Sequence, residues 1–206
     1  MSSARQRILT AAAGIHRARG LSALTIRAVA RKVGVTPMAI YRHFRDKEAL
    51  VEALVDSGFV RWESSLATAI DVREPVARIR AALIAYAEFA LRDPHSFELM
   101  FLSRRENVPE APRSLAGSAS PAFSTLITTV REAMGQSMIA EGGAAETTLL
   151  AWATAHGLIA LHFSGRFGHD ARKFQAVYVS AVDRLLGLLA ASAPIPSRSS
   201  RTDGAR

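Results

Sequence analysis

The spacing of apolar residues is helical along almost the whole chain, and this feature limits the fold to the all-α class. No segment alternates apolar and polar residues at a period of two for long, so no strand is predicted. A residue that can cap a helix is followed by proline at four places: Thr36-Pro37, Glu74-Pro75, Asp93-Pro94 and Ser120-Pro121. Proline suits the first position of a helix because its missing N–H would have no partner inside the helix. Each pair therefore predicts a helix start.

We expect about nine helices in two domains. The predicted ranges are 4–19, 26–33, 37–44, a long helix from 46, then 75–92, 94–104, 121–140, a helix from the Gly142-Gly143 pair to 167, and 170–191. We assign residues 1–48 to a first domain and 49–192 to a second. Residues 105–120 are rich in Pro, Ser and Gly and are expected to form a loop. Residues 193–206 are polar, and we expect them to be a disordered tail.

Positive charge is concentrated in the first quarter of the chain. Residues 1–50 contain ten Lys and Arg and two acids, a balance of 10 − 2 = +8, which equals the formal net charge of all 206 residues. A basic module joined to a near-neutral body is typical of a protein that binds a polyanion, with DNA or RNA favoured over a membrane. Solubility is the simpler explanation, but an even scatter of charge would serve that purpose better.

Several function classes lack their usual residues. The chain contains no cysteine, so disulfides, cysteine zinc sites and thiol nucleophiles are excluded. The apolar stretch 149–163 is too short to span a bilayer, and no signal peptide is recognisable. Nucleophile-elbow, phosphate-loop and zinc-protease motifs are missing, and His162 and His169 are too far apart to share a metal on one helix. We expect a cytoplasmic protein that is not an enzyme and has no metal, cofactor or membrane partner.

Two short predicted helices, 26–33 and 37–44, are separated by Gly34-Val35-Thr36. This spacing predicts a helix-turn-helix, whose second helix enters the major groove of DNA. Gly34 permits the positive φ of a sharp turn. The expected core of this unit consists of Ile26, Val29, Ala30, Val35, Ile40 and Phe44.

The candidate DNA-binding residues divide by chemistry. Helix N-termini attract anions, so Arg27 and the Thr36-Pro37 start are placed at phosphates. Tyr41, His43 and Lys47 are further phosphate candidates. Met38, Ala39 and Arg42 are left for base edges, because arginine can make two hydrogen bonds to guanine and apolar side chains can contact the thymine methyl group. The alternatives are a half-buried aromatic for Tyr41 and solvated surface groups for the others.

Residues 5–54, and above all LTIRAVARKVGVTPMAIYRHFRDKEALVEAL, resemble the DNA-binding domain of the TetR family of transcriptional regulators. The resemblance implies a dimer that places two recognition helices in successive major grooves of a partly palindromic operator. It also implies that Thr36, Tyr41, His43 and Lys47 hold phosphates. One departure is His16-Arg17, which stands where the family usually has a bulky apolar pair; another is Leu21, where Phe is common.

The second domain resembles a subgroup of the same family through Trp152-Ala153-Thr154-Ala155-His156-Gly157. This resemblance implies a helical bundle with a ligand cavity, dimerised through its last two helices. The sequence supports a dimer independently, because the helix expected to end at 167 has small residues that allow close approach and the helix expected over 170–191 is apolar over more than one stripe. The predicted interface residues are Ala155, Phe174, Tyr178, Val182, Leu185 and Leu189. The alternative is a fully buried helix in a monomer.

A mostly apolar ligand pocket is predicted among the four helices expected between residues 75 and 167. Aromatic and flexible apolar side chains with one polar anchor, His156, suit such a pocket. The predicted lining residues are Tyr86, Phe89, Met100, Phe101, Phe123, Met134, Trp152 and His156. Ordinary core packing is the alternative for each of them.

Together these patterns predict a ligand-responsive DNA-binding transcriptional regulator. We expect a repressor that a small-molecule inducer releases from a palindromic operator of double-stranded DNA. The alternative is a helical small-molecule-binding or scaffold protein whose basic N-terminus binds polyanions without sequence preference.

Overall fold

The computed structural model describes residues 3–103 and 121–190, and over these ranges it confirms the all-α prediction. The described residues form nine α-helices. Their β structure is limited to one isolated bridge between Ile139 and Ala190. The helices are α1 Ala4–Arg19, α2 Ile26–Val33, α3 Pro37–Tyr41, α4 Lys47–Ile70, α5 Pro75–Arg92, α6 Pro94–Phe97, α7 Pro121–Gly135, α8 Ala144–Phe163 and α9 Ala171–Leu189. The expected loop at 105–120 and the tail at 193–206 lie outside the described residues.

Two short segments complete the helical path. A 3-10 turn, η1 Leu21–Ala23, follows α1, and a π-helical turn, η2 Glu98–Leu102, continues α6. The prediction of one helix over 94–104 is therefore replaced by α6 followed by η2. No described helix is long and apolar enough to cross a membrane.

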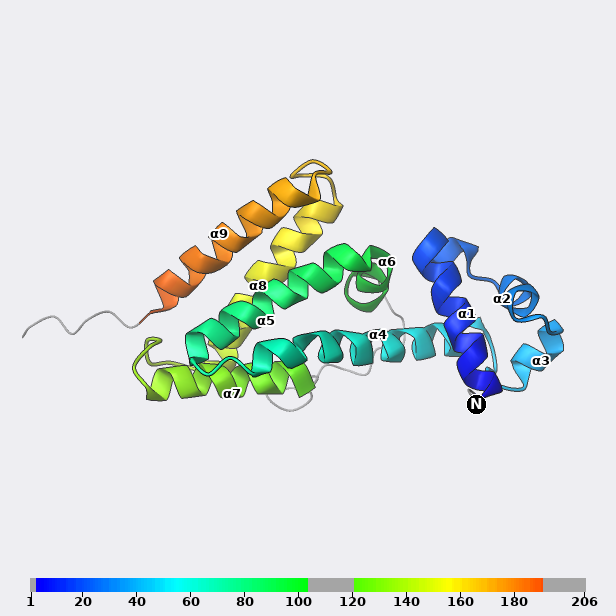
Figure 1. The fold of residues 1–206 in the computed structure, drawn as a ribbon, viewed down its shortest axis with the longest axis horizontal. Helices are drawn as coiled ribbons and strands as arrows, with labels where there is room; N and C mark the ends of the chain where they lie inside the picture. The colour runs from blue at the N-terminus through cyan, green and yellow to red at the C-terminus, as the bar shows by residue number, and fades with distance from the viewer. Residues whose placement is uncertain (1–2, 104–120, 191–206) are drawn as a thin grey trace, which may run out of the picture.

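The helices α1, α2 and α3 form a small head, and α4 connects it to the body formed by α5 to α9 (Figure 1). In the body, α5 packs against α4, α7, α8 and α9, so it is the central helix. The phenol O–H of Tyr178 on α9 donates to the carbonyl of Leu83 on α5 at 2.8 Å, in a buried contact that fixes α9 against α5. The long α4 runs from the body to the head (Figure 1) and packs against both α5 and α1.

Helix starts follow the predicted cap-proline pairs, but several helices end earlier than expected. Helix α3 stops at Tyr41, because both His43 and Phe44 turn their N–H groups back to the Ile40 carbonyl. Helix α7 stops at Gly135, and Ser137 then adopts a positive φ of 56°. Helix α8 stops at Phe163, ahead of Gly165 with a φ of 78°. Each end is a turn that the helical periodicity alone did not reveal.

Candidate nucleic-acid interface and effector cavity

Two threonine caps and one glycine fix the start of α2 and the turn between α2 and α3. The hydroxyl of Thr25 accepts the N–H of Ala28 at 3.1 Å, and that of Thr36 accepts the N–H of Ala39 at 3.4 Å. Between them Gly34 adopts the left-handed conformation, with φ 77° and ψ 35°, and ends α2. Because a side chain is strained in that conformation, glycine fits the turn. Pro37 occupies the first turn of α3 as predicted.

The side chains that orient the two helices are buried, with one exception. Val29, Ala30, Ile40 and Phe44 are buried, and Ile26 is half-buried against the same core. The prediction that Val35 joins them is wrong: it lies on the turn itself and is exposed. Since Ile40 is fully buried, α3 turns its opposite face to solvent.

The outward face of α3 carries the predicted base-reading and phosphate residues. The Met38 side chain is 68% exposed and Tyr41 is 48% exposed, which is unusual for large apolar groups. The remaining exposed candidates are Arg27, Thr36, Pro37, Arg42 and His43, while Ala39 and Lys47 are half-buried. The structure therefore brings all nine predicted residues to one end of the molecule.

The cations of this surface are available to a partner. Within the described ranges, Arg27, Arg42 and Lys47 form no salt bridge. One of the two acids in the first fifty residues, Asp46, is already engaged: it caps α4 by accepting the N–H of Ala49 at 2.7 Å and pairs with Arg45. These contacts, the Ala49 N–H first, hold the pKa of Asp46 below its usual value. The head therefore presents uncompensated positive charge to solvent.

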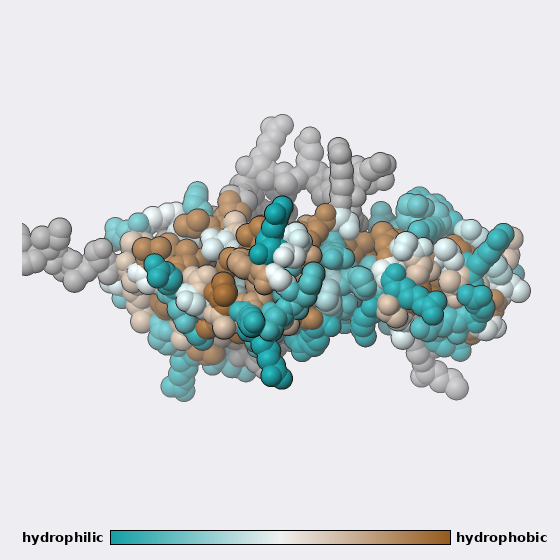
Figure 2. Space-filling model, turned by 90° about the horizontal axis from the view of Figure 1, so that it is seen from above, coloured by the Kyte–Doolittle hydropathy of each residue, from teal (hydrophilic) through white to brown (hydrophobic). Residues whose placement is uncertain are grey.

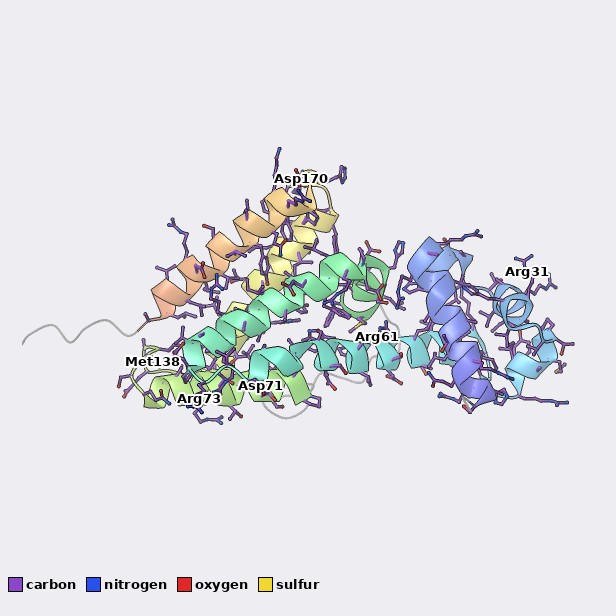
Figure 3. The ribbon with its side chains drawn as sticks, viewed as in Figure 1. Arg31, Arg61, Asp71, Arg73, Met138 and Asp170 are labelled. Carbon is purple, nitrogen blue, oxygen red and sulfur yellow. The ribbon has the colours of Figure 1, made fainter. Side chains whose placement is uncertain are left out.

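Sequence reasoning missed further cations in the head. The guanidinium of Arg5 stacks over the Phe44 ring, 4.9 Å from its centroid. Arg31 projects from α2 on the outside of the head (Figure 3). The charge count of the first fifty residues includes these cations, but their spacing along the chain does not predict which of them lie on the same face.

A polar junction joins the head to the body. On α1, the Nε2 atom of the buried His16 lies 3.0 Å from the His95 carbonyl oxygen. The buried carboxylate of Asp93 pairs with Arg17 of α1 at 3.4 Å and with Arg61 of α4 at 3.5 Å. Figure 3 places Arg61 on the part of α4 beneath α6. His16 and Arg17, which depart from the usual apolar pair of the resembled family, therefore both contact the start of α6.

The body contains an apolar cavity of about 120 Å³ between α4, α5 and α7, which continues into a smaller space of about 30 Å³. Leu66, Ala82, Ala122 and Leu126 line both. The smaller space is closed by aromatic walls: Trp62, Tyr86, Phe123 and Trp152. Tyr86, Phe123 and Trp152 of the predicted pocket are therefore brought together.

Other predicted pocket residues lie elsewhere. Phe89, Met100 and Met134 do not line this cavity. Met100 packs instead across Gly58 of α4, where a Cβ would meet its sulfur at 2.5 Å. Phe101 packs edge-on to Trp62 and Tyr86, beside the cavity and outside its walls. Trp62, Leu66 and Leu126 were missed because their helical spacing equally fits plain core packing.

His156 stands behind the aromatic wall as the polar anchor of Tyr86. Its Nδ1 atom lies 2.9 Å from the Tyr86 hydroxyl. Burial lowers the pKa of His156 and raises the pKa of Tyr86 far above its usual value. The lowered pKa favours the neutral imidazole at neutral pH, and a hydrogen bond joins its Nδ1 to the Tyr86 hydroxyl.

The predicted dimer residues divide between the inside and the surface of one chain. Ala155, Phe174, Tyr178 and Val182 are buried inside the chain, so the prediction that these four side chains contact a partner is wrong. They face inward because α9 packs on α5 and α8. Leu185 and Leu189 are half-buried. The large apolar residues exposed on these helices are Leu150 and Leu161 on α8 and Val177 and Leu188 on α9.

Hydropathy also distinguishes the two parts of the molecule. Seen from above, brown hydrophobic patches lie over the body, and the head is mostly teal (Figure 2). A surface with exposed apolar patches on one part and polar groups on the other fits separate regions for protein and polyanion contact.

Two family models match this chain. The model described as bacterial regulatory proteins, tetR family, matches residues 8–54. The model described as tetracyclin repressor-like, C-terminal domain, matches residues 79–185, which is more than half of the chain. The two matches cover the head and most of the body.

Solved structures share this fold over most of their length. A protein of unknown function from Rhodococcus sp. RHA1 is 30% identical with a TM-score of 0.77, covering 92% of this chain and 97% of that one. The regulator PfmR from Thermus thermophilus is 18% identical with a TM-score of 0.62, covering 90% and 97%. A tetR-family transcriptional regulator from Pectobacterium atrosepticum is 22% identical with a TM-score of 0.67, covering 91% and 94%. The last two likenesses show the fold.

Proposed function

Since this chain belongs to the TetR family of bacterial transcriptional regulators, we propose that it is a repressor released from a palindromic operator by a small molecule. Its membership makes it a DNA-binding regulator, and regulators of this family are not enzymes. The observation that carries the proposal is the outward face of α3, which exposes Met38 and Tyr41 beside cations that form no salt bridge within the described ranges. The protein would act in the cytoplasm, where bacterial DNA lies.

We assign the contacts of the head by what each side chain can offer. Arg27, Tyr41, His43 and Lys47 would bind phosphates, together with the Thr36-Pro37 start of α3. Phosphate contacts fix the position of a protein on the duplex but carry no sequence information. Met38, Ala39 and Arg42 would contact base edges in the major groove, and they would provide the sequence preference.

Two copies would associate through the outer faces of α8 and α9. On α8 Leu150 and Leu161 are exposed, and Gly157 lies between them, where a Cβ would meet nothing within 4 Å. On α9 Val177 and Leu188 are exposed. An isologous dimer would cover this apolar surface with its own copy and present two heads to one duplex. This set replaces the four buried residues of the sequence-based interface.

The cavity would hold the effector. Its walls belong to α4, α5 and α7, so a ligand that widens it would displace α4, and α4 leads to the head. The Asp93 junction ties α1 and α4 to the start of α6 and would carry the same displacement to α1. Such a ligand releases DNA only if it binds the DNA-incompetent arrangement more tightly.

The test is selection of bound duplexes from a random pool with the purified full chain. The proposal predicts enrichment of an inverted repeat that survives excess competitor DNA. Enrichment that disappears with competitor, or steep loss with salt for every sequence alike, would instead indicate nonspecific polyanion binding. Repeating the selection with candidate metabolites tests the effector, since an inducer should remove the enrichment.

A further inference from the structure

The cavity wall contains a buried hydrogen-bond donor without a partner among the described residues. Trp62 is 7% exposed, and within the described ranges the N–H at its indole Nε1 makes no hydrogen bond. Trp62 belongs to the aromatic wall of the smaller space, together with Phe123 and Trp152. A buried donor without an acceptor is costly, and such groups are rare in folded proteins. This orphan N–H therefore needs an explanation, and the adjoining cavity offers one.

The hydroxyl and guanidinium groups of the wall are already paired. The hydroxyls of Thr125 and Thr129 donate to carbonyls one turn earlier, at 2.9 and 3.0 Å. Arg78 donates to the carbonyls of Val72 and Arg73 and to the carboxylate of Glu132. The Tyr86 hydroxyl is bonded to His156. Of the two indoles in the wall, Trp152 is half-buried and interacts with the Tyr86 hydroxyl, whereas Trp62 is buried. Among the described lining residues, Trp62 is thus the buried donor that lacks a partner.

Charge and volume narrow the class of ligand further. The carboxylate of Glu63 lines the larger space, and within the described part of the chain it forms no ion pair. Glu63 is half-exposed, so water can solvate it, but it would repel an anion. An apolar cavity of about 150 Å³ is large enough to hold benzene, and the two connected spaces here measure about 120 and 30 Å³.

We propose that the effector is a small, mainly apolar molecule without negative charge, whose carbonyl or similar acceptor takes the N–H of Trp62. This inference rests on the proposed function only in naming the cavity as the effector site. A ring of six carbons with one ketone oxygen has the required size and chemistry. The bound ligand would supply the missing acceptor, and the apolar walls would cover its hydrocarbon part.

The experiment compares cyclohexanone with methylenecyclohexane, which has the same shape but no acceptor oxygen, and with the anion cyclohexanecarboxylate. Binding is followed without DNA in the ¹⁵N-labelled chain, through the indole N–H signals of its two tryptophans. The Trp62 signal, assigned with the Trp62→Phe variant, should move downfield with cyclohexanone and much less with methylenecyclohexane. The carboxylate should bind weakest.

Variants then isolate the donor. Trp62→Phe keeps an aromatic ring but removes the N–H, and it should reduce the preference for the ketone over the alkene by about tenfold. The comparison variant is Trp152→Phe, which removes the same atoms from another wall residue, and the preference should fall clearly less in it than in Trp62→Phe. If Trp62→Phe does not fold, the Trp152→Phe variant assigns the two indole signals, and the downfield shift of the Trp62 signal in the native chain decides.

Three results would overturn the inference: no binding of either neutral probe, an unchanged preference in Trp62→Phe, or tightest binding of the carboxylate. These outcomes are distinct from failure of the proposed function. If DNA selection fails but the ketone preference depends on Trp62, the role as a regulator is wrong and the cavity chemistry stands. If selection succeeds and neither neutral probe binds, DNA binding stands and this inference falls.

Discussion

At the scale of single residues, Tyr41 presents a phenol on the outer face of α3 with 48% of its side chain exposed. Tyr41→Phe removes only the hydroxyl and leaves the ring. If that hydroxyl donates to a phosphate, affinity should fall about tenfold for every duplex, because the contact carries no sequence information. Fluorescence anisotropy on the selected operator and on a scrambled duplex measures both affinities. Equal affinities of variant and wild type would remove Tyr41 from the phosphate contacts.

Arg42 stands beside Tyr41 but has the opposite expected behaviour. Its exposed guanidinium has no salt-bridge partner within the ranges described, so it can make two hydrogen bonds to a guanine. Arg42→Ala should cost about 1–3 kcal/mol at one base pair and relax the preference there. Repeating the selection with the variant shows whether a single position of the motif loses information. A motif that keeps all its positions would place Arg42 away from the bases.

His162 provides a pH-dependent term in stability. It is buried and stacked on Phe174, with ring centroids 4.1 Å apart, and burial lowers its pKa. The unfolded chain therefore binds a proton more readily than the folded chain, so stability falls as the pH drops through the ordinary histidine range. In His162→Phe the free energy of unfolding should depend less on pH, and the change in slope should correspond to at most about one proton per chain. Thermal unfolding of both chains between pH 7.5 and pH 5.5, an interval of about one unit around the histidine pKa, measures it. A variant with the same pH dependence as wild type would contradict this account.

Residue-level predictability differed between the head and the body. In the head, α2 and α3 are close in sequence and their caps fix the geometry, so the outward side of α3 followed from the spacing of Ile40 and Phe44. Val35 was misplaced because an apolar residue in a turn can face either way. In the body, Trp62 and Phe89 have the same helical spacing signal, and only the packing of other helices decides which one lines a cavity.

At the scale of elements, the junction between α1, α4 and α6 depends on one carboxylate. Asp93 caps α6 by accepting the N–H of Ser96 at 3.3 Å and also pairs with Arg17 and Arg61. Asp93→Asn keeps an acceptor for the cap but removes the charge from between two guanidinium groups. We expect a loss of about 1 kcal/mol in the free energy of unfolding and a weaker effect of the effector on DNA binding.

Urea denaturation gives the first quantity, and operator affinity with and without effector gives the second. The control is Asp183→Asn. Asp183 lies on α9 and is the exposed salt-bridge partner of Arg80 on α5, far from the junction in sequence. This variant should leave the effector response intact. An Asp93→Asn chain with unchanged effector response would show that coupling does not pass through this junction.

Helix starts could be predicted because caps and prolines act within one turn. The junction could not, since its contacts join residues far apart in the chain: His16 meets the carbonyl of His95 across 79 residues. Likewise, the wide apolar surface of α9 predicted burial on two sides, but its sequence did not say which side meets the chain's own α5. The stripe with Phe174 and Tyr178 packs inward, which leaves the stripe with Val177 and Leu188 outside.

At the scale of the whole molecule, the exposed face of α8 and α9 decides whether two heads act together. Leu161→Glu places a carboxylate on this face, where Leu161 is 45% exposed, and should weaken the dimer by about a hundredfold or more because burying an unpaired charge is costly. The fold should be kept, since the side chain faces solvent in one chain. The matched control is Val60→Glu, at a 62% exposed position on α4.

Sedimentation velocity over a range of concentrations distinguishes the two variants. The Val60→Glu chain should remain a dimer with native operator affinity, while the Leu161→Glu chain should sediment as a monomer and lose high-affinity binding. If Leu161→Glu still dimerises as the wild type does, the interface lies on another face.

The most direct measurement of the central claim is a methylation-protection footprint on the duplex obtained by selection. If two heads each place α3 in the major groove, guanine N7 atoms should be protected in two segments about one helical turn apart on one face of the duplex. Tyr41→Phe should weaken both segments together. Protection of a single segment, or of the minor groove alone, would contradict the account.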